Sequence, residues 1–473
     1  MNLELCYLTA RDAIRLFRSR ELSPVELVTG IIERAEELEP AINAFADTYF
    51  DEALEQARAA ERRYRDDTAR PLEGIPVGVK DAQRIAGKRT TYGSLVLKDN
   101  VDSQSDPMIE RLQAAGAIIH ARTTTPEFCL SVCCHSHLWG VTRNPFNRQY
   151  GPGGSSGGSG ASLAAGTSLL ATGTDIGGSI RIPASCCGVV GYKPPKGRNP
   201  DGPPANFDPY NHCGPLARSV GDAALMQNLI SGPHPRDHSS LRETIVLPDA
   251  FPAIRGLRIA WSMDLGFKAI DTEVRANTLQ ALDVFRSLGC AVEEVGLDWS
   301  RECDQAALAW YSTMHFGRQP LWFMADHKHL MTDYAIAAAE MAASLKPDEA
   351  ARSWEAQHAM YQAFGRIMES HDLFVCPTTA IPALPAEQDM LDPDFEIDGQ
   401  RTDPEYGPVL THYFNMLHNC PVMSVPSGRA GNGVPTGIQL VGRTFDDITV
   451  FSAAAAYENA VGGWFADGRR PGL

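Results

Sequence analysis

The sequence of this 473-residue chain lacks the features that mark membrane-spanning, secreted and nucleic-acid-binding proteins. No apolar stretch of about 18 residues occurs, so no membrane-spanning helix is expected. Residues 1–7 lack a basic start followed by an apolar run and therefore predict no secretory signal. The net charge of −16 does not favour nucleic-acid binding through bulk electrostatics. We expect a soluble, cytoplasmic protein that binds neither membrane nor nucleic acid.

Patterns that predict disulfides, metal sites or nucleotide sites are also scarce. The 11 cysteines are an odd number and contain no Cys-x-x-Cys pair, so we expect reduced thiols. His-x-His pairs begin at His135 and His327, but no convincing set of further metal ligands lies beside either pair. The glycine-rich centre lacks the lysine of a phosphate-binding loop. We therefore predict no metal and no cofactor.

The composition is that of an ordinary globular protein with enough apolar residues for a large core. Hydrophobic residues make up 44% of the chain and charged residues 21%. Residues 1–66 are predicted to be helical, with Ser23 capping a helix that starts at Pro24. A second helical segment is predicted at 302–370 and a small-residue helix at 161–171. No internal repeat is evident.

The most informative feature present is a pair of glycine-rich segments, 153–160 and 173–183. They offer serine hydroxyls together with bare backbone N–H groups, and a serine hydrolase needs both, as nucleophile and as oxyanion donors. Asp175 and Arg181, if buried, would pair and brace a turn that the glycines allow. That turn would present Ser179 at its tip.

No histidine is evident as the base that would activate Ser179, because no Ser-His-Asp set lies near these glycines. Ile75, Val77 and Val79 alternate with other residues and predict a short strand that ends at Lys80. A lysine that ends an apolar strand is expected inside the protein. Burial favours the neutral amine, and a neutral amine is a base.

Lys80, Ser155 and Ser179, in these settings, resemble the amidase signature family. The match is essentially complete over residues 153–184, and similar landmarks recur along most of the chain, at 22–26, 125–128, 188–193, 214–218 and 437–442. The resemblance implies one α/β domain over residues 1–473 with its signature core at 67–230. It also implies a mixed central β-sheet covered by helices on both faces.

The resemblance further implies a role for each site residue. Ser179 would be the nucleophile, Ser155 the bridging serine after a cis bond from Gly154, and Lys80 the terminal base. Lys80 would take the Ser155 proton while Ser155 takes that of Ser179, and an acyl-enzyme would form. Asp175 and Arg181 would be structural supports. The oxyanion would lie among the backbone N–H groups of Ile176, Gly177, Gly178 and Ser179.

The substrate pocket is less well defined by the sequence. In the family, a residue just after the segment at 125–128 lines the acyl site, and Cys129 and Ser131 lie there, although Cys129 could equally be a small buried hydrophobe. The irregular loop 195–213 follows the catalytic segment and is expected to influence specificity. We predict that its Phe207 and Tyr210 contact the substrate's leaving group; alternatively, the loop only covers the sheet.

The predicted function is that of a standalone amidase acting on a small or aryl amide. Esters and carbamates (urethanes) stay open as substrates, because the same acyl chemistry cleaves them. A rival within the family is the glutaminase subunit of a tRNA-dependent amidotransferase, although segment 206–212 looks unlike its counterpart in such subunits. A non-catalytic binding protein would be expected to lack Lys80, Ser155 or Ser179. The expected partner is a small-molecule substrate, and a homodimer stays open.

Overall fold

A large β-sheet runs through the centre of the computed structural model, which describes residues 3–466 and 468–473. The sheet has 11 strands in the order β1-β3-β2-β6-β8-β7-β14-β15-β11-β9-β10. Their bounds are β1 Phe45–Thr48, β2 Pro76–Lys80, β3 Ile118–Thr123, β6 Leu170–Asp175, β7 Val190–Lys193, β8 His212–Ala217, β9 Arg258–Trp261, β10 Ala291–Glu294, β11 Leu373–Pro377, β14 Val422–Arg429 and β15 Pro435–Gly442. Two small two-stranded sheets join β4 His135–Ser136 to β5 Gly140–Val141 and β12 Glu396–Ile397 to β13 Gln400–Arg401.

Strand pairing in the central sheet is mixed, as the sequence predicts. β2 pairs in parallel with both β3 and β6, and β9 pairs in parallel with β10 and β11. The pairs β6–β8, β7–β14 and β14–β15 are antiparallel. Because β2 and β6 are parallel neighbours, their carboxyl ends lie at the same edge of the sheet. That edge carries both Lys80 and Asp175.

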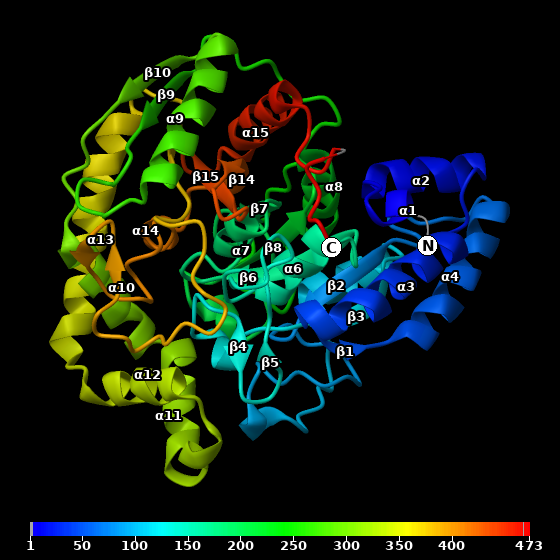
Figure 1. Cartoon of the computed structure of the whole chain (residues 1–473), viewed down its shortest axis with the longest axis horizontal. Coiled ribbons are helices and arrows are strands. Elements are labelled where there is room, and N and C mark those ends of the chain that lie inside the picture. Colours follow the sequence, from blue (N-terminus) through cyan, green and yellow to red (C-terminus); the bar gives the residue numbers. More distant parts are fainter. Residues whose placement is uncertain (1–2, 467) are drawn as a thin grey trace.

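Helices surround the sheet (Figure 1). The N-terminal helices lie at one end of the molecule and α10 to α13 at the other. The helices span α1 Leu3–Cys6, α2 Ala10–Ser19, α3 Pro24–Ile42, α4 Phe50–Arg65, α5 Pro107–Ala114, α6 Gly157–Ala165, α7 Arg181–Cys186, α8 Val220–Ile230, α9 Thr272–Ser287, α10 Arg301–Thr313, α11 His315–His327, α12 Asp333–Ser344, α13 Pro347–Met368, α14 Tyr413–Met416 and α15 Asp447–Val461. Among the described residues, no helix is long and apolar enough to cross a membrane.

The N-terminal segment is helical apart from one strand that the sequence analysis missed. Ser23 caps α3 with Pro24 at its first turn, as predicted, and Glu26 completes a capping box. Residues 45–48 are not helical, however, because they form β1, which pairs antiparallel with the neighbouring strand β3. Four residues are too few for their periodicity to distinguish a strand from a helix.

The small-residue helix predicted at 161–171 has different bounds in the structure. It begins earlier, at Gly157 within the glycine-rich run, and ends at Ala165. Gly166 adopts a left-handed conformation with φ 76°, and its N–H bonds back to Leu163, which closes the helix. Leu170 then starts β6. The prediction was wrong over its last residues because a glycine C-cap terminates the helix.

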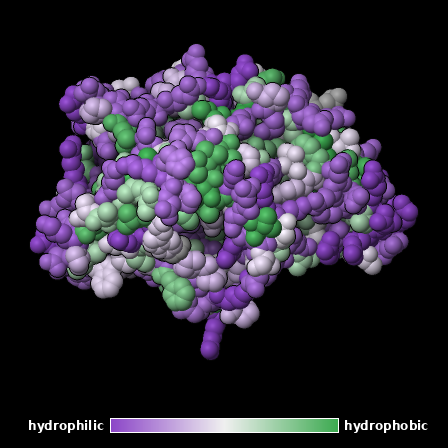
Figure 2. All heavy atoms as spheres, turned by 90° about the horizontal axis from the view of Figure 1, so that it is seen from below, coloured by the Kyte–Doolittle hydropathy of each residue, from purple (hydrophilic) through white to green (hydrophobic). Residues whose placement is uncertain are grey.

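Strands near the site are buried along their whole length. Every residue of β2, β3, β7 and β8 is buried, which fits strands covered on both faces. The outer surface is different in character. Figure 2 shows a face on which hydrophilic residues predominate and apolar groups form separate patches. The chemistry described next is therefore enclosed by the core of the protein.

Candidate active site

Lys80 ends β2 in a fully buried position, with 0% of its surface exposed to solvent. Its Nζ lies 2.7 Å from Ser155 Oγ and 2.8 Å from Thr174 Oγ1. Burial lowers the pKa of Lys80 from its ordinary value, because an ammonium ion loses its hydration in the core. The strand predicted from the sequence therefore delivers a largely desolvated amine to a serine hydroxyl.

Ser155 lies two residues before α6 and follows a cis peptide bond from Gly154, the bond that the family resemblance implies. Gly154 itself is tightly enclosed by backbone. A Cβ added there would lie 2.4 Å from the carbonyl oxygen of Ser131 and 2.8 Å from that of Cys133. Only glycine fits this contact, so the Ser155 segment and the loop around Ser131 are packed directly against each other.

The turn that carries Ser179 connects β6, which ends at Asp175, to α7, which begins at Arg181. The Asp175 carboxylate holds both ends of this turn. It accepts hydrogen bonds from the N–H groups of Gly178 at 2.8 Å and Ile180 at 3.2 Å. It also forms an ion pair with Arg181 at 2.8 Å, and neither side chain is exposed. Burial raises the pKa of Asp175, but Arg181 and its hydrogen bonds outweigh burial and hold the pKa below its usual range.

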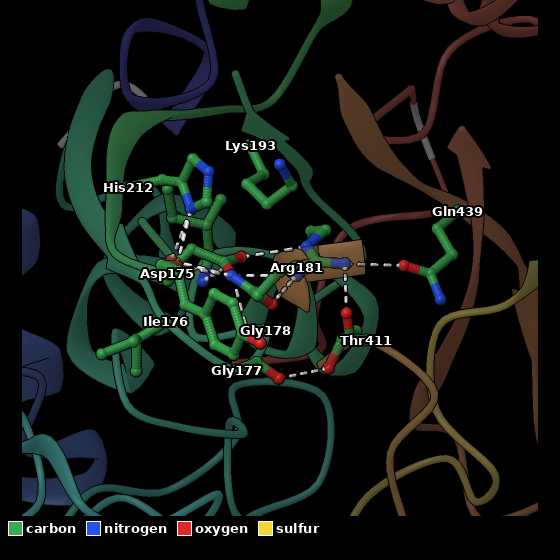
Figure 3. Close-up of polar contacts among 12 residues, drawn as sticks. Asp175, Ile176, Gly177, Gly178, Arg181, Lys193, His212, Thr411 and Gln439 are labelled. Atoms are coloured by element: carbon green, nitrogen blue, oxygen red, sulfur yellow. Dashed lines mark hydrogen bonds and ion pairs between the residues drawn. The ribbon is translucent and has the colours of Figure 1, made fainter. Parts of the chain in front are cut away.

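Arg181 in turn connects the turn to a distant part of the chain. Figure 3 shows its guanidinium reaching from Asp175 toward Thr411 and Gln439. Nη1 donates to the Thr411 carbonyl and to Gln439 Oε1, both at 2.9 Å, and Nη2 donates to Asn415 Oδ1 at 2.6 Å. The guanidinium is thus satisfied on both sides. The geometry is that of a brace between the Ser179 turn and the second half of the sheet.

The four N–H groups predicted for the oxyanion are not equivalent in the structure. The Gly178 N–H donates to Asp175 Oδ1 and so takes part in the brace, while its role as an oxyanion donor stays a prediction. Within the described ranges, the N–H groups of Ile176, Gly177 and Ser179 donate to no acceptor in the turn. These three donors are the ones free to bind a developing negative charge.

A small cavity of about 90 Å³ opens beside Ser179. It brings together the predicted residues Cys129, Ser131, Ile176, Gly177 and Ser179. The remaining wall was not predicted and consists of Leu130, Val132, Ile182, Tyr311, Glu405, Tyr406, Val409 and His412. A narrower apolar pocket adjoins it and shares Val132, Ile182 and Val409.

The two predicted specificity residues of the loop 195–213 are not among the cavity-lining residues. Phe207 is 65% exposed and stacks on His238 at a centroid distance of 4.4 Å. Tyr210 is fully buried, stacks on Trp310 at 4.7 Å and donates its hydroxyl to Gln357. Both rings therefore already have protein partners, and Tyr210 reaches the cavity only through its edge-on contact with the wall residue Tyr311, at a centroid distance of 6.2 Å. The sequence did not predict this burial of Tyr210, because the residue that a loop tyrosine packs against inside the protein leaves no local sequence pattern.

Tyr311 and His412 form part of the wall instead. Tyr311 donates its hydroxyl to the Ile176 carbonyl at 2.9 Å. His412 Nε2 lies 2.8 Å from Asp304, which also pairs with Lys268 at 3.1 Å. Burial lowers the pKa of His412, although Asp304 opposes that shift. Sequence reasoning missed these two wall residues because their contacts join segments far apart in the chain.

The histidine pairs considered as metal ligands are not accompanied by further donors. Within the described ranges, no group of three or more His, Cys, Asp or Glu side chains is arranged to hold a metal ion. His135 packs edge-on against Tyr334. The chemistry of the site is therefore considered through its serines, its lysine and its backbone amides.

A substitution at Gly178 tests whether the brace shapes the turn. Gly178 has φ 122°, and an added Cβ would lie 1.9 Å from Thr411 Oγ1, so Gly178→Ala should displace the free N–H groups and lower amide hydrolysis by roughly 100-fold. Gly296→Ala is the matched control, because an added Cβ there would meet no atom within 4 Å and Gly296 does not line the cavity. Steady-state kinetics and thermal unfolding of both variants measure the effect. Equal activity of the two variants would contradict the proposed brace.

Comparison with known proteins gives the same picture over the whole chain. The sequence profile of the Amidase family matches residues 26–451. An acylamidase of Rhodococcus erythropolis is 32% identical over 97% of this chain and 96% of its own length. A glutamyl-tRNA(Gln) amidotransferase subunit of Chloroflexus aggregans is 33% identical over 99% of both chains.

Solved structures agree with the sequence relatives. A bacterial aryl acylamidase of the amidase signature family superposes with a TM-score of 0.89 at 29% identity, covering 96% of both chains. A 6-aminohexanoate cyclic dimer hydrolase complexed with substrate gives a TM-score of 0.82 at 26% identity, covering 96% of this chain and 97% of the other. The chain therefore belongs to the amidase family, has the amidase signature fold and is an amide-hydrolysing enzyme.

Proposed function

We propose that this enzyme hydrolyses carboxylic amides through a relay of Ser179, Ser155 and Lys80. The observation that carries the proposal is the 2.7 Å distance between Lys80 Nζ and Ser155 Oγ in a fully buried setting. A neutral Lys80 accepts the Ser155 proton while Ser155 accepts the proton of Ser179. Ser179 Oγ then attacks the amide carbonyl carbon.

The turn around Ser179 supplies the rest of the chemistry. The oxyanion is bound by the free N–H groups of Ile176, Gly177 and Ser179, each worth roughly 100- to 1000-fold in rate by analogy with other hydrolases. The relay then returns its proton to the leaving amine as the C–N bond breaks, which leaves an acyl group on Ser179. Water attacks this ester through the same relay and releases the acid.

The substrate is proposed to be a small or aryl amide. Val132, Ile182 and Val409 give the cavity and its adjoining pocket apolar walls suited to an alkyl or aryl group. The likeness to acylamidases supports the same class. Cys129 and Ser131 lie in the wall near Ser179 and are proposed to contact the acyl part. Esters and carbamates stay alternatives, because the acyl transfer is the same.

A standalone enzyme is favoured over an amidotransferase subunit by the charge of the cavity. Glutamine carries an α-carboxylate, which needs a cationic or donor-rich partner. Among the described residues of the cavity wall there is no lysine or arginine, whereas Glu405 adds a carboxyl group. The wall therefore offers no cationic partner for the α-carboxylate of glutamine, although several relatives are amidotransferase subunits.

A cytoplasmic location is proposed because the cysteines form no disulfide bonds. All 11 are free and buried, as expected of a protein kept in a reducing compartment. The single-domain organisation, the absence of nucleic-acid binding and the homodimer stay predictions.

Labelling with a serine-directed aryl phosphonate tests the nucleophile. Wild-type protein should gain one adduct, located on Ser179 by peptide mass spectrometry, and Ser179→Ala should gain none because no other group is presented to the oxyanion donors. Ser185→Ala is the matched control, since Ser185 is buried in α7 without lining the cavity. An adduct on Ser155 or on Cys129 would refute the assignment.

The pH profile tests the base. Because burial lowers the pKa of Lys80, kcat/KM should rise with pH as the amine deprotonates and level off below the pH expected for a lysine in water. Lys80→Ala and Lys80→Arg should each lose roughly 100-fold or more, since arginine stays charged. Lys328→Arg, at an exposed surface ion pair, should match the wild type. Near-normal turnover by Lys80→Arg would rule out the relay.

Comparing glutamine with anilides distinguishes the two family functions. The purified chain alone should hydrolyse an uncharged aryl amide and show little or no glutaminase activity, because the wall offers no cation for the α-carboxylate. Released nitroaniline and released ammonia measure the two reactions. Efficient glutamine hydrolysis would instead favour the amidotransferase subunit.

A further inference from the structure

Glu405 is a carboxyl group in the wall of the cavity that the proposed mechanism does not use. It lies in the segment between β13 and α14, beside Tyr406. Its carboxylate accepts hydrogen bonds from the Val132 N–H at 3.1 Å and from Ser131 Oγ at 3.3 Å. These contacts fix the side chain against the loop that also carries Cys129.

A negative charge on Glu405 has no cationic partner among the described residues. None of the ion pairs found in the described part of the chain includes Glu405, and no lysine or arginine lines the cavity there. Burial raises the pKa of Glu405 to about 8, and nearby Asp403 adds to the shift against the bonds from Val132 and Ser131. A carboxylate at this position is stabilised if a ligand brings a positive charge.

The position of Glu405 indicates which part of a substrate would meet it. Ser131 and Val132, its hydrogen-bond partners, follow Cys129, and all three line the same cavity as Ser179. The Cys129 side of the cavity is the side proposed above for the acyl group. Two donors occupy part of the carboxylate, and its remaining lone pairs can accept further hydrogen bonds.

We propose that Glu405 binds a cationic nitrogen on the acyl part of the substrate, so that the enzyme prefers amides of amino-substituted carboxylic acids. This preference rests on the proposed amide hydrolysis at Ser179. The ammonium group replaces the missing cation in the wall and donates to the Glu405 carboxylate. Uncharged acyl groups of the same length leave the carboxyl group without that partner.

Pairs of 4-nitroanilides with matched acyl groups test the preference. One pair is β-alanyl and butanoyl, and a longer pair is 6-aminohexanoyl and heptanoyl, so that each pair compares an ammonium with a methyl group at equal length. In at least one pair, wild-type kcat/KM should favour the ammonium by about 10- to 100-fold, the range of a charge-assisted hydrogen bond. A ratio of one or less in both pairs, with normal hydrolysis of the uncharged anilides, would overturn the proposal and leave amide hydrolysis intact.

Glu405→Gln shows whether Glu405 causes the preference. The amide oxygen still accepts from the Val132 N–H, so the loop contact is retained while the negative charge is lost. The ammonium-to-methyl ratio should fall toward one in this variant. Glu396→Gln removes an exposed carboxylate on β12 and should keep the wild-type ratio. An unchanged ratio in Glu405→Gln would overturn the assignment, as would a preference seen only for an ammonium on the amine part of the substrate.

Binding to Ser179→Ala separates failure of this inference from failure of the proposed reaction. Calorimetric titration with 6-aminohexanamide and heptanamide, and with β-alaninamide and butanamide, requires no turnover. At least one ammonium ligand should bind about 10-fold or more tightly than its uncharged partner, and Glu405→Gln in the same background should remove the difference. Equal binding within both pairs would overturn the role of Glu405 even if no anilide is hydrolysed.

Discussion

The buried ion pair of Asp175 and Arg181 is the interaction on which the rest of the site depends. Two charges removed from water are stable only when their geometry is good and their other hydrogen-bonding groups are satisfied. Here the carboxylate accepts from the backbone of the Ser179 turn, and the guanidinium donates to Thr411 and Gln439. Loss of either partner would leave an uncompensated buried charge, which typically costs ~3–5 kcal/mol. One pair thus fixes the turn and binds it to the second half of the sheet.

Sheet topology places Lys80, the proposed base, beside that turn. β2 and β6 are parallel neighbours, so Lys80 and Asp175 end adjacent strands at the same edge. Lys80 Nζ consequently lies 2.8 Å from Thr174 Oγ1 on β6 as well as beside Ser155. Covering helices keep this edge dry, and a dry environment favours the neutral amine. The fold therefore supplies the position of the lysine and lowers its pKa.

Sequence reasoning found the features that local pattern determines and missed those that depend on distant contacts. The strand ending at Lys80 and the pairing of Asp175 with Arg181 follow from an alternating run and from a short motif, and both are present. The hydrogen bond from the Gly178 N–H to Asp175 was not predicted, because the acceptor that this N–H faces depends on the backbone geometry of the turn. Glu405 was missed because it reaches the cavity from a segment more than 200 residues after Ser179. No local periodicity marks such a residue.

This division between local and distant residues explains how one scaffold can serve different amides. The proposed relay and oxyanion donors come from strand ends and a braced turn, where a substitution disturbs a tightly packed core. The rest of the cavity wall comes from the connecting segments around Ser131 and Glu405 and from Tyr311 on α10. A substitution in that wall alters the charge or shape seen by the acyl group and leaves the brace intact. Relatives that share the same arrangement at the ends of β2 and β6 can therefore prefer different substrates. In this enzyme, the carboxyl group of Glu405, which has no cationic partner among the described residues, is the wall feature proposed to set its preference.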